Sequence, residues 1–329
     1  MSDMEGRKDL PLVSICIPTF NRAEALTLCL GDLITNKQSD IEIVVSDNGS
    51  TDNTESVMKQ FQDEGIRYFR NEKNLGFDLN LIKTVEHARG EYVFFLSDED
   101  YVDYKNILWL LEQIRQKKTV TQFLGTTINK QKNIEKIYNM YGDITLKQGC
   151  ESLNAVLFEC SYMSGIVLKK DSLDLNKAKD YVSCAYMFVI FQAQAMLKGD
   201  TVCSSKIFCY QGKEHNLSYD KDEKQKSSII GNPIANPYHY LSRVHQLKEL
   251  IKLVYEVTDD IKTRHILFNK LRNRIAVQLA ASLFISLNQF KDFISKVSQI
   301  REVWFSPYFW IFLLKHITIK AVYNITRQK

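Results

Sequence analysis

Four short apolar runs in the first hundred residues constrain the fold more than any other feature of the chain. They cover residues 13–18, 41–45, 66–69 and 92–96, and their β-branched and aromatic residues favour strands. Between them, apolar residues recur at helical spacing, first at Ala23, Leu26, Leu30 and Leu33. Strands and helices that alternate in this way predict an α/β fold: a mostly parallel sheet flanked by helices, with right-handed crossovers.

Each of the four runs ends in polar residues, at positions 18–22, 47–52, 71–76 and 97–100. Ligands of parallel α/β sheets bind outside the carboxyl ends of the strands, near the point where the strand order reverses. The pattern therefore predicts a binding site at one edge of the sheet that carries four carboxylates: Asp47, Asp98, Glu99 and Asp100. Ser50 and Asp52 stand directly before a predicted helix, and capping that helix is the simpler explanation for them.

The Asp98-Glu99-Asp100 triplet follows a run that is apolar throughout. Three adjacent carboxylates repel one another unless a cation lies among them, and their hard oxygen atoms suit Mg²⁺ or Mn²⁺. Such an ion would neutralise a departing diphosphate. A solvated acidic turn is the alternative, and the position directly after the fourth strand argues against it.

Four motifs in this region resemble those of the family 2 glycosyltransferases, which have the GT-A fold. They are IPTFNR at residues 17–22, VVSDNGSTD at 44–52, KNLG at 73–76 and FFLSDED at 94–100. The serine-led LSDED form is similar to the abequosyltransferase-like subgroup of surface-polysaccharide enzymes. The resemblance implies a GT-A fold with a helical C-terminal region. It also implies the metal-dependent, inverting transfer of a hexose from a nucleoside diphosphate to a saccharide or lipid-linked saccharide.

The same resemblance implies roles for residues at the strand ends. It implies a nucleotide pocket lined by Pro18, Thr19, Arg22, Asp47, Asn74, Gly76 and Asp98. Asp47 would accept a hydrogen bond from the base, and a carboxylate suits the imide N–H of uracil or thymine, so UDP or dTDP donors are favoured. Asp98 and Asp100 would hold the Mg²⁺ or Mn²⁺ ion, with His215 as a further ligand. Many members of the family have L-D-x-D-D here, where this chain has Ser97 first, and the carboxylate that binds metal directly is left open.

The general base is a second departure from the family pattern. An inverting transferase needs a base for the acceptor hydroxyl, and the family usually supplies it in a Glu-Asp pair, which residues 150–200 lack. Asp180 lies at about the family's distance and precedes a predicted helix, so it is the predicted base. A surface position without a catalytic role is the alternative for Asp180, and equally for the lone imidazole of His215.

Charge divides the chain into two parts. Residues 240–329 carry a net charge of +9 and the remainder −5, and residues 220–237 are charged and then rich in Gly, Asn and Pro. We therefore predict a GT-A domain over residues 1–237 and a helical, basic region over 238–329. The apolar run 308–314 is far shorter than the ~20 residues that span a bilayer, but beside lysines it suits a helix in a membrane interface. Packing on the catalytic domain or on another subunit, as in a homo-oligomer, is the alternative.

Other classes of function are excluded by what the sequence lacks. Seven Cys without a C-x-x-C pair indicate reduced thiols, and the polar N-terminus holds no secretory apolar region. We therefore expect a cytoplasmic protein, peripheral on the cytoplasmic face of the membrane. No G-x-G-x-x-G follows a strand, which excludes dinucleotide oxidoreductases, and no nucleic-acid-binding motif is present. A nucleotidyltransferase would need a Gly-rich loop after the first strand.

One alternative of another class stays open, a non-catalytic, membrane-associated assembly subunit with a degenerate transferase domain. The missing Glu-Asp pair favours it, and the intact acidic triplet opposes it.

Overall fold

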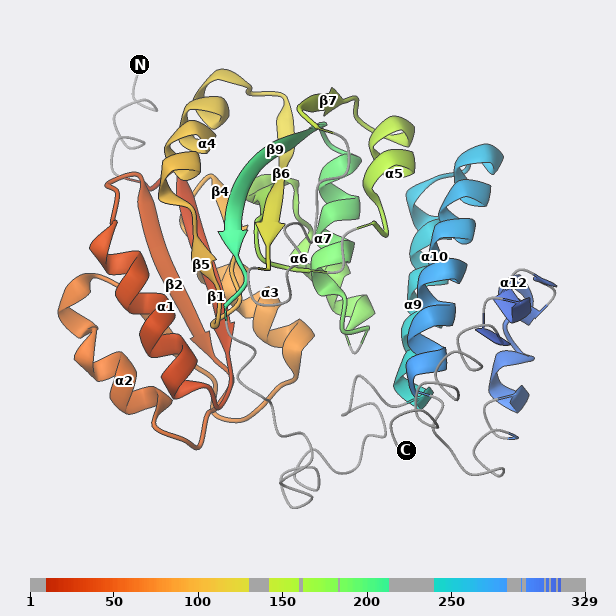
Figure 1. Cartoon of the computed structure of the whole chain (residues 1–329), viewed down its shortest axis with the longest axis horizontal. Helices are drawn as coiled ribbons and strands as arrows, with labels where there is room; N and C mark the ends of the chain where they lie inside the picture. The colour runs from red at the N-terminus through yellow and green to blue at the C-terminus, as the bar shows by residue number, and fades with distance from the viewer. Residues whose placement is uncertain are drawn as a thin grey trace, which may run out of the picture. The chain divides into compact units, whose positions relative to one another are not determined.

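The computed structural model describes residues 10–129, 142–159, 162–182, 184–212, 240–282, 291, 294–304, 306–307, 309–311 and 313–314. The chain divides into two compact units. The first comprises Met1–Val182 and Met187–Leu217, and the second comprises Ser183–Tyr186 and Ser218–Lys329. The domain boundary predicted at residue 237 lies outside the described residues. Figure 1 shows the sheet and helices of the first unit and the helices of the second.

The first four strands form a parallel half of the sheet, as the four apolar runs predict. They pair in the order β3-β2-β1-β4 and comprise β1 (Val13–Thr19), β2 (Ile41–Asp47), β3 (Arg67–Arg70) and β4 (Tyr92–Phe95). Thr19 pairs with Asp47, and Asp47 pairs with Arg70, so the carboxyl ends of three strands lie at one level. β1 and β4 are buried along their whole length, which explains why their sequences are nearly continuously apolar.

Helices connect these strands. They are α1 (Ala23–Thr35), α2 (Thr54–Gln60), which is followed by the short 3₁₀ helix η1 (Gln62–Glu64), and α3 (Phe77–His87). Asp52 accepts hydrogen bonds from the backbone N–H groups of Thr54 and Ala23, both at 3.0 Å. Its carboxylate therefore ties the start of α2 to the start of α1, although the N-cap residue of α2 is Asn53 and not Asp52.

The second half of the sheet is mixed. β8 (Ile166–Lys169) runs antiparallel to both β4 and β6 (Val120–Ile128), and β9 (Asp200–Tyr210) runs parallel to β6. β5 (Tyr101–Val102) and β7 (Ile144–Leu146) pair antiparallel with β9. The other described elements are α4 (Tyr104–Gln116), α5 (Cys150–Val156), η2 (Lys170–Ser172), α6 (Leu175–Ala178), η3 (Lys179–Tyr181) and α7 (Met187–Met196).

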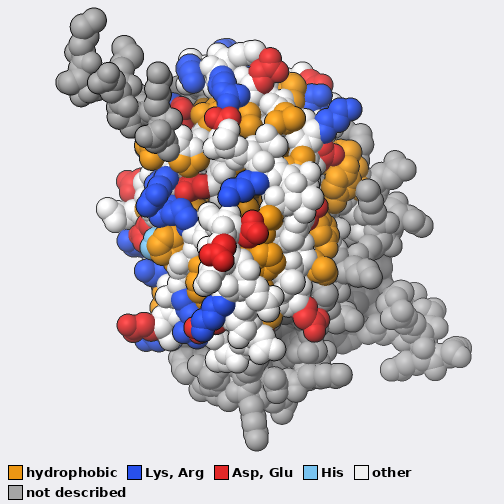
Figure 2. All heavy atoms as spheres, turned by 90° about the vertical axis from the view of Figure 1, so that its left-hand side faces the viewer, with side chains coloured by type: hydrophobic (Ala, Val, Ile, Leu, Met, Phe, Trp, Pro, Cys, Tyr) orange, Lys and Arg blue, Asp and Glu red, His pale blue; other side chains and the backbone are white. Residues whose placement is uncertain are grey.

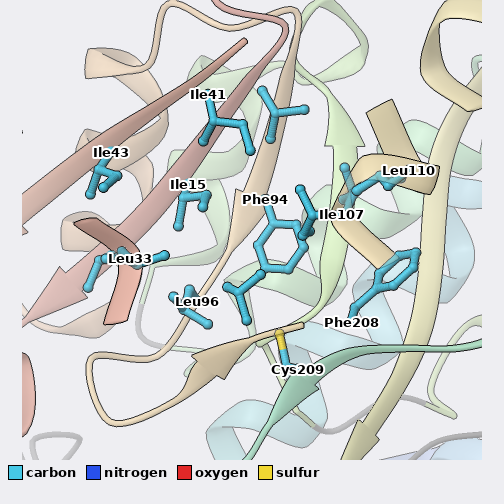
Figure 3. Close-up of a cluster of buried hydrophobic side chains, with 14 of the residues drawn as sticks. Ile15, Leu33, Ile41, Ile43, Phe94, Leu96, Ile107, Leu110, Phe208 and Cys209 are labelled. Carbon is cyan, nitrogen blue, oxygen red and sulfur yellow. The ribbon is translucent and has the colours of Figure 1, made fainter. Parts of the chain in front are cut away.

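The core of the first unit lies between the sheet and the helices α1 and α4. Figure 3 shows Phe94 of β4 at its centre, between Ile15 of β1 and Ile107 of α4. The other face of the sheet is covered by α7, whose Phe191 stacks on Phe95 with ring centroids 6.0 Å apart. On the face in Figure 2, acidic and basic side chains alternate with scattered apolar ones over the described residues, as is ordinary for a folded surface.

A buried polar side chain of β6 has no hydrogen-bond partner, and this leads to a stability prediction. Gln122 of β6 is fully buried, and neither its amide nitrogen nor its oxygen is hydrogen-bonded. An unsatisfied buried polar group costs about 1–3 kcal/mol, so Gln122→Met should raise the free energy of unfolding by about 1 kcal/mol. Thermal unfolding of both proteins measures the change.

The neighbouring Thr121 provides the matched control. Its hydroxyl donates to the carbonyl oxygen of Ala195 at 2.7 Å, so Thr121→Val removes a hydrogen bond that is made and should lower stability. A Gln122→Met protein that unfolds at a lower temperature than the wild type would contradict the prediction.

The second unit is helical, as predicted for the C-terminal region. It contains α9 (Tyr240–Val257), α10 (Ile261–Ser282) and α12 (Arg301–Trp304). α9 and α10 pack together, with the rings of Tyr255 and Phe268 in edge contact at 5.3 Å. No helix in the described part of the chain combines the length and hydropathy needed to cross a bilayer. Of the aromatic residues predicted to face a membrane or a partner, Phe309 is buried in this unit, and the indole of Trp310 donates to the carbonyl oxygen of Trp304 at 2.9 Å.

Candidate active site at the carboxyl edge of the sheet

Asp98 lies at the point where the strand order reverses, between β1 and β4. Only 3% of its surface is exposed. The hydroxyl of Thr19, the last residue of β1, donates to Asp98 Oδ2 at 2.7 Å, and Arg22 Nη1 donates to Asp98 Oδ1 at 3.0 Å. The same Arg22 nitrogen lies 2.9 Å from Glu99 Oε2. The structure therefore brings Thr19, Arg22 and Asp98 together, with a guanidinium between two carboxylates.

Burial controls the protonation of this cluster. It raises the pKa of Asp98, while the charge of Arg22 and the hydrogen bond from Thr19 oppose the shift. Burial likewise raises the pKa of Asp100, against hydrogen bonds from Ser164, Tyr162 and the backbone of Gly212. Positive charge favours the ionised form of a neighbouring carboxylate. A cation that binds at this edge together with a ligand would therefore stabilise the ionised carboxylates there.

Asp47 ends β2 and is fully buried. Its Oδ1 accepts the backbone N–H of Ser50 at 2.8 Å, and its Oδ2 accepts the hydroxyl of Tyr68 at 2.7 Å and faces Arg70 Nε at 3.3 Å. Both oxygens of the predicted base acceptor are thus engaged within the protein. Arg70, whose side chain is 39% exposed, covers it and is a charged group that the sequence analysis did not select.

The loop over residues 71–76 is held by Asn48, another residue that the sequence analysis missed. Asn48 Oδ1 accepts the backbone N–H of Leu75 at 2.9 Å, while Nδ2 donates to Asn74 Oδ1 at 2.8 Å and to the carbonyl oxygen of Gly76 at 3.2 Å. Asn74 and Gly76 are therefore placed at the edge as predicted. The remaining predicted pocket residue, Pro18, is buried within β1 opposite Ser46.

The predicted base, Asp180, is not brought to this edge. Asp180 is exposed on η3, where the neighbouring Lys179 pairs with Glu86 of α3 at 3.2 Å. Glu86 lies eight residues, about 12 Å, along the helix from Asp78, which is in the first turn of α3 at the site end. His215 lies outside the described residues.

The donor set at this edge fits a hard divalent ion that is shared with a ligand. The described residues hold no group of three or more His, Cys, Asp or Glu side chains arranged for a metal. Mg²⁺ is, however, usually bound by one or two carboxylates together with substrate phosphates and water. Asp98 and Glu99 provide that number, and the guanidinium between them shows that the position accepts positive charge.

Comparison with known proteins assigns the family. Residues 14–170, from β1 to the end of β8, match the family described as Glycosyl transferase family 2. The chain carries a family 2 glycosyltransferase domain. All four polar strand ends lie inside the match, so the family predicted from the four motifs is confirmed.

Curated relatives agree with this assignment. The chain is 29% identical over 247 residues to abequosyltransferase RfbV of Salmonella typhimurium, which covers 67% of this chain and 72% of that protein. It is 32% identical over 136 residues to the GalNAc(5)-diNAcBac-PP-undecaprenol beta-1,3-glucosyltransferase of Campylobacter jejuni, with coverage of 40% and 44%. The first of these belongs to the subgroup that the LSDED motif resembles.

A solved structure confirms the fold. S. aureus TarS 1-349 in complex with UDP superposes with a TM-score of 0.65 at 16% identity, over 95% of this chain and 91% of that chain. At this identity the likeness concerns the fold alone. The chain thus has the predicted GT-A type of fold with a helical C-terminal region. The sheet is mixed and not mostly parallel as predicted, because β8, β5 and β7 run antiparallel to their neighbours.

Proposed function

We propose that this chain is an inverting glycosyltransferase of surface-polysaccharide assembly. It would move a hexose from a nucleoside diphosphate to a saccharide or lipid-linked saccharide acceptor. One observation carries the proposal. Thr19 and Arg22 of the β1 end meet Asp98 of the β4 end across the reversal of strand order, where α/β proteins bind nucleotides. The name of the Salmonella relative, abequosyltransferase, supports the transfer of a sugar. The complexes of TarS with UDP and UDP-GlcNAc support a nucleotide-sugar donor.

Uracil or thymine is the proposed base. The base would lie over the β2 end, where Asp47 is the acceptor for an imide N–H. Arg70 now covers the Asp47 carboxylate at 3.3 Å, and its partly exposed side chain can turn outward to admit the base. A UDP or dTDP donor is therefore favoured over GDP and CDP.

Mg²⁺ or Mn²⁺ is the proposed cofactor, and the carboxylates of Asp98 and Glu99 would hold it. When bound, the ion would neutralise the charge that builds up on the departing diphosphate. The chain's own contribution on that side is Arg22, which lies at 3.0 Å from Asp98 and can move from the carboxylates to the phosphate oxygens. Thr19 keeps Asp98 oriented while this happens.

Binding of the nucleotide provides the first experiment. Titration calorimetry should compare UDP, dTDP, CDP and GDP, each with Mn²⁺ or with EDTA, and radioactive transfer to lipid-linked saccharides should follow. We expect UDP or dTDP to bind with Mn²⁺ at least about tenfold, or 1.4 kcal/mol, more tightly than the other two nucleotides. If no nucleotide binds in the presence of metal, the transferase proposal is wrong, and the non-catalytic assembly subunit takes its place.

The sequence predicts Asp180 as the general base, and the Asp180→Asn variant decides between that role and a surface position without a catalytic role. Loss of a general base costs about 10²–10⁴-fold in rate, whereas a surface substitution changes free energies by about 0.5 kcal/mol, a factor of roughly 2. Because η3 adjoins the far end of α3, we expect the second value for kcat of Asp180→Asn in the transfer assay. A fall of a hundredfold or more would show that Asp180 reaches the acceptor.

Peripheral membrane contact on the cytoplasmic face is proposed for the second unit. Ile311 and Leu314 are 62% and 59% exposed near the end of the described chain, and the C-terminal third carries the net charge of +9. Apolar side chains beside cations bind anionic interfaces. Co-sedimentation with phosphatidylglycerol vesicles tests the contact, with phosphatidylcholine vesicles as the control. A protein that sediments with neither type of vesicle would contradict the proposal.

A further inference from the structure

We propose that Asp100 is a positioning residue and not a ligand of the metal. It would hold the turn over residues 97–100 so that Asp98 and Glu99 face the ion and the diphosphate. The inference rests on the proposed function, because it concerns the same metal and nucleotide site.

Three donors from the protein engage both oxygens of the Asp100 carboxylate. Its Oδ1 accepts the hydroxyl of Tyr162 at 2.9 Å and the backbone N–H of Gly212 at 3.0 Å. Its Oδ2 accepts the same Tyr162 hydroxyl at 2.7 Å and the hydroxyl of Ser164 at 2.5 Å. The residue has no exposed surface. These contacts come from three donors, because the single proton of the Tyr162 hydroxyl is shared between the two oxygens. Both oxygens are thus engaged, and the buried carboxylate presents no surface that an ion could approach.

The partners of Asp100 come from the ends of other strands and fix the turn from two sides. Ser164, just before β8, also accepts the backbone N–H of Ser97 at 2.8 Å, so its hydroxyl links the first residue of the turn to the last. Gly212 follows β9, and a Cβ atom at this position would lie 1.6 Å from the carbonyl oxygen of Glu99. The backbone of Gly212 is therefore in contact with the turn itself, and only glycine fits there.

The charge distribution separates the two ends of the turn. The partners of Asp100 are neutral hydroxyl and amide groups. Asp98 and Glu99 instead share the cationic Arg22 at 3.0 and 2.9 Å. A divalent ion is held by groups that a cation can approach. In this structure the guanidinium of Arg22 already lies beside Asp98 and Glu99. Asp100 acts on the ion only through the orientation of these two residues.

Binding of Mn²⁺ in the presence of UDP tests the inference, measured by loss of the electron paramagnetic resonance signal of free Mn²⁺. We expect Asp98→Asn to abolish the bound ion. Asp100→Asn and Tyr162→Phe should each keep one Mn²⁺ per chain with an affinity lowered about tenfold, the usual effect of removing a group that orients a ligand. The double variant should be no weaker than the weaker single variant. Tyr210→Phe is the matched control, because it removes a Tyr–Asp hydrogen bond to Asp103 at 2.9 Å and should leave the Mn²⁺ affinity unchanged.

Two outcomes would overturn the inference. If Asp100→Asn loses the ion while Tyr162→Phe binds it like the wild type, Asp100 is a ligand. If both variants unfold at a lower temperature but bind Mn²⁺ with wild-type affinity, Asp100 serves stability alone. Tyr162→Phe keeps the aromatic ring and two donors to Asp100, so it gives an answer even where Asp100→Asn fails to fold. A wild type that binds no UDP would refute the proposed function itself, and this result is distinct from the other two.

Discussion

Asp98→Asn is expected to lower kcat/KM for sugar transfer by at least about 100-fold, the cost of removing one preorganised charged group from an active site. The side chain keeps its shape, and Thr19 keeps an oxygen or nitrogen partner. The charge that holds Arg22 at 3.0 Å is lost, however, and the guanidinium then pairs with Glu99 alone. Steady-state transfer kinetics and UDP titration measure the effect on turnover and on donor binding.

Asp171→Asn is the matched control for this prediction. Asp171 is also an aspartate next to the sheet, following β8, but its side chain is 76% exposed. Its replacement should leave kcat/KM within a factor of roughly 2. Full activity of Asp98→Asn would place the donor site away from the end of β4.

Gly49→Ala should strongly damage the site through a single added methyl group. Gly49 has φ of +73°, and a Cβ atom there would lie 2.7 Å from the carbonyl carbon of Lys73. Positive φ costs a non-glycine residue about 1–2 kcal/mol, and forced contacts cost a further 1–3 kcal/mol. We expect a loss of about 3 kcal/mol, or a fall in Tm of roughly 6–12 °C for a unit of this size. Nucleotide binding should weaken as well, because the shifted Lys73 adjoins Asn74.

Gly31→Ala separates this effect from the general cost of adding a methyl group. Gly31 lies inside α1 with no atom within 4 Å of its Cβ position, so alanine should stabilise the helix by about 0.5–1 kcal/mol. Thermal scans of the two variants should therefore move in opposite directions. Equal Tm values would mean that the loop after β2 yields to the added methyl group.

The sequence was sufficient to predict the parallel half of the fold because two of its four strands, β1 and β4, are buried on both faces. β1 and β4 have no exposed residue, so their composition is unmistakable, and the polar residues after them lie where parallel topology requires. β8 was harder to place because it runs antiparallel to both of its neighbours. A short apolar run in the sequence does not indicate whether the strand runs parallel or antiparallel to its neighbours.

The residues of the candidate site that belong to a sequence motif were predicted. The residues that hold the motif in place from distant parts of the chain were missed. Thr19, Arg22 and Asp98 meet as expected. Tyr162 and Ser164, which hold Asp100, are 62 and 64 residues away from it and carry no local signal. Asp180 was expected at the edge from its position along the sequence. The backbone, however, reaches the site end of α3 only at Met187, whose N–H donates to Asp78 at 3.3 Å.

The hydrogen bond between Asp100 and Gly212, which spans 112 residues, affects how the protein is made. At a synthesis rate of about 5–20 residues per second, Gly212 emerges roughly 6–22 s after Asp100. During that time the parallel strands can assemble on the ribosome, but the turn after β4 lacks its last partner. This edge of the sheet is therefore completed only after β9 and Gly212 have been added.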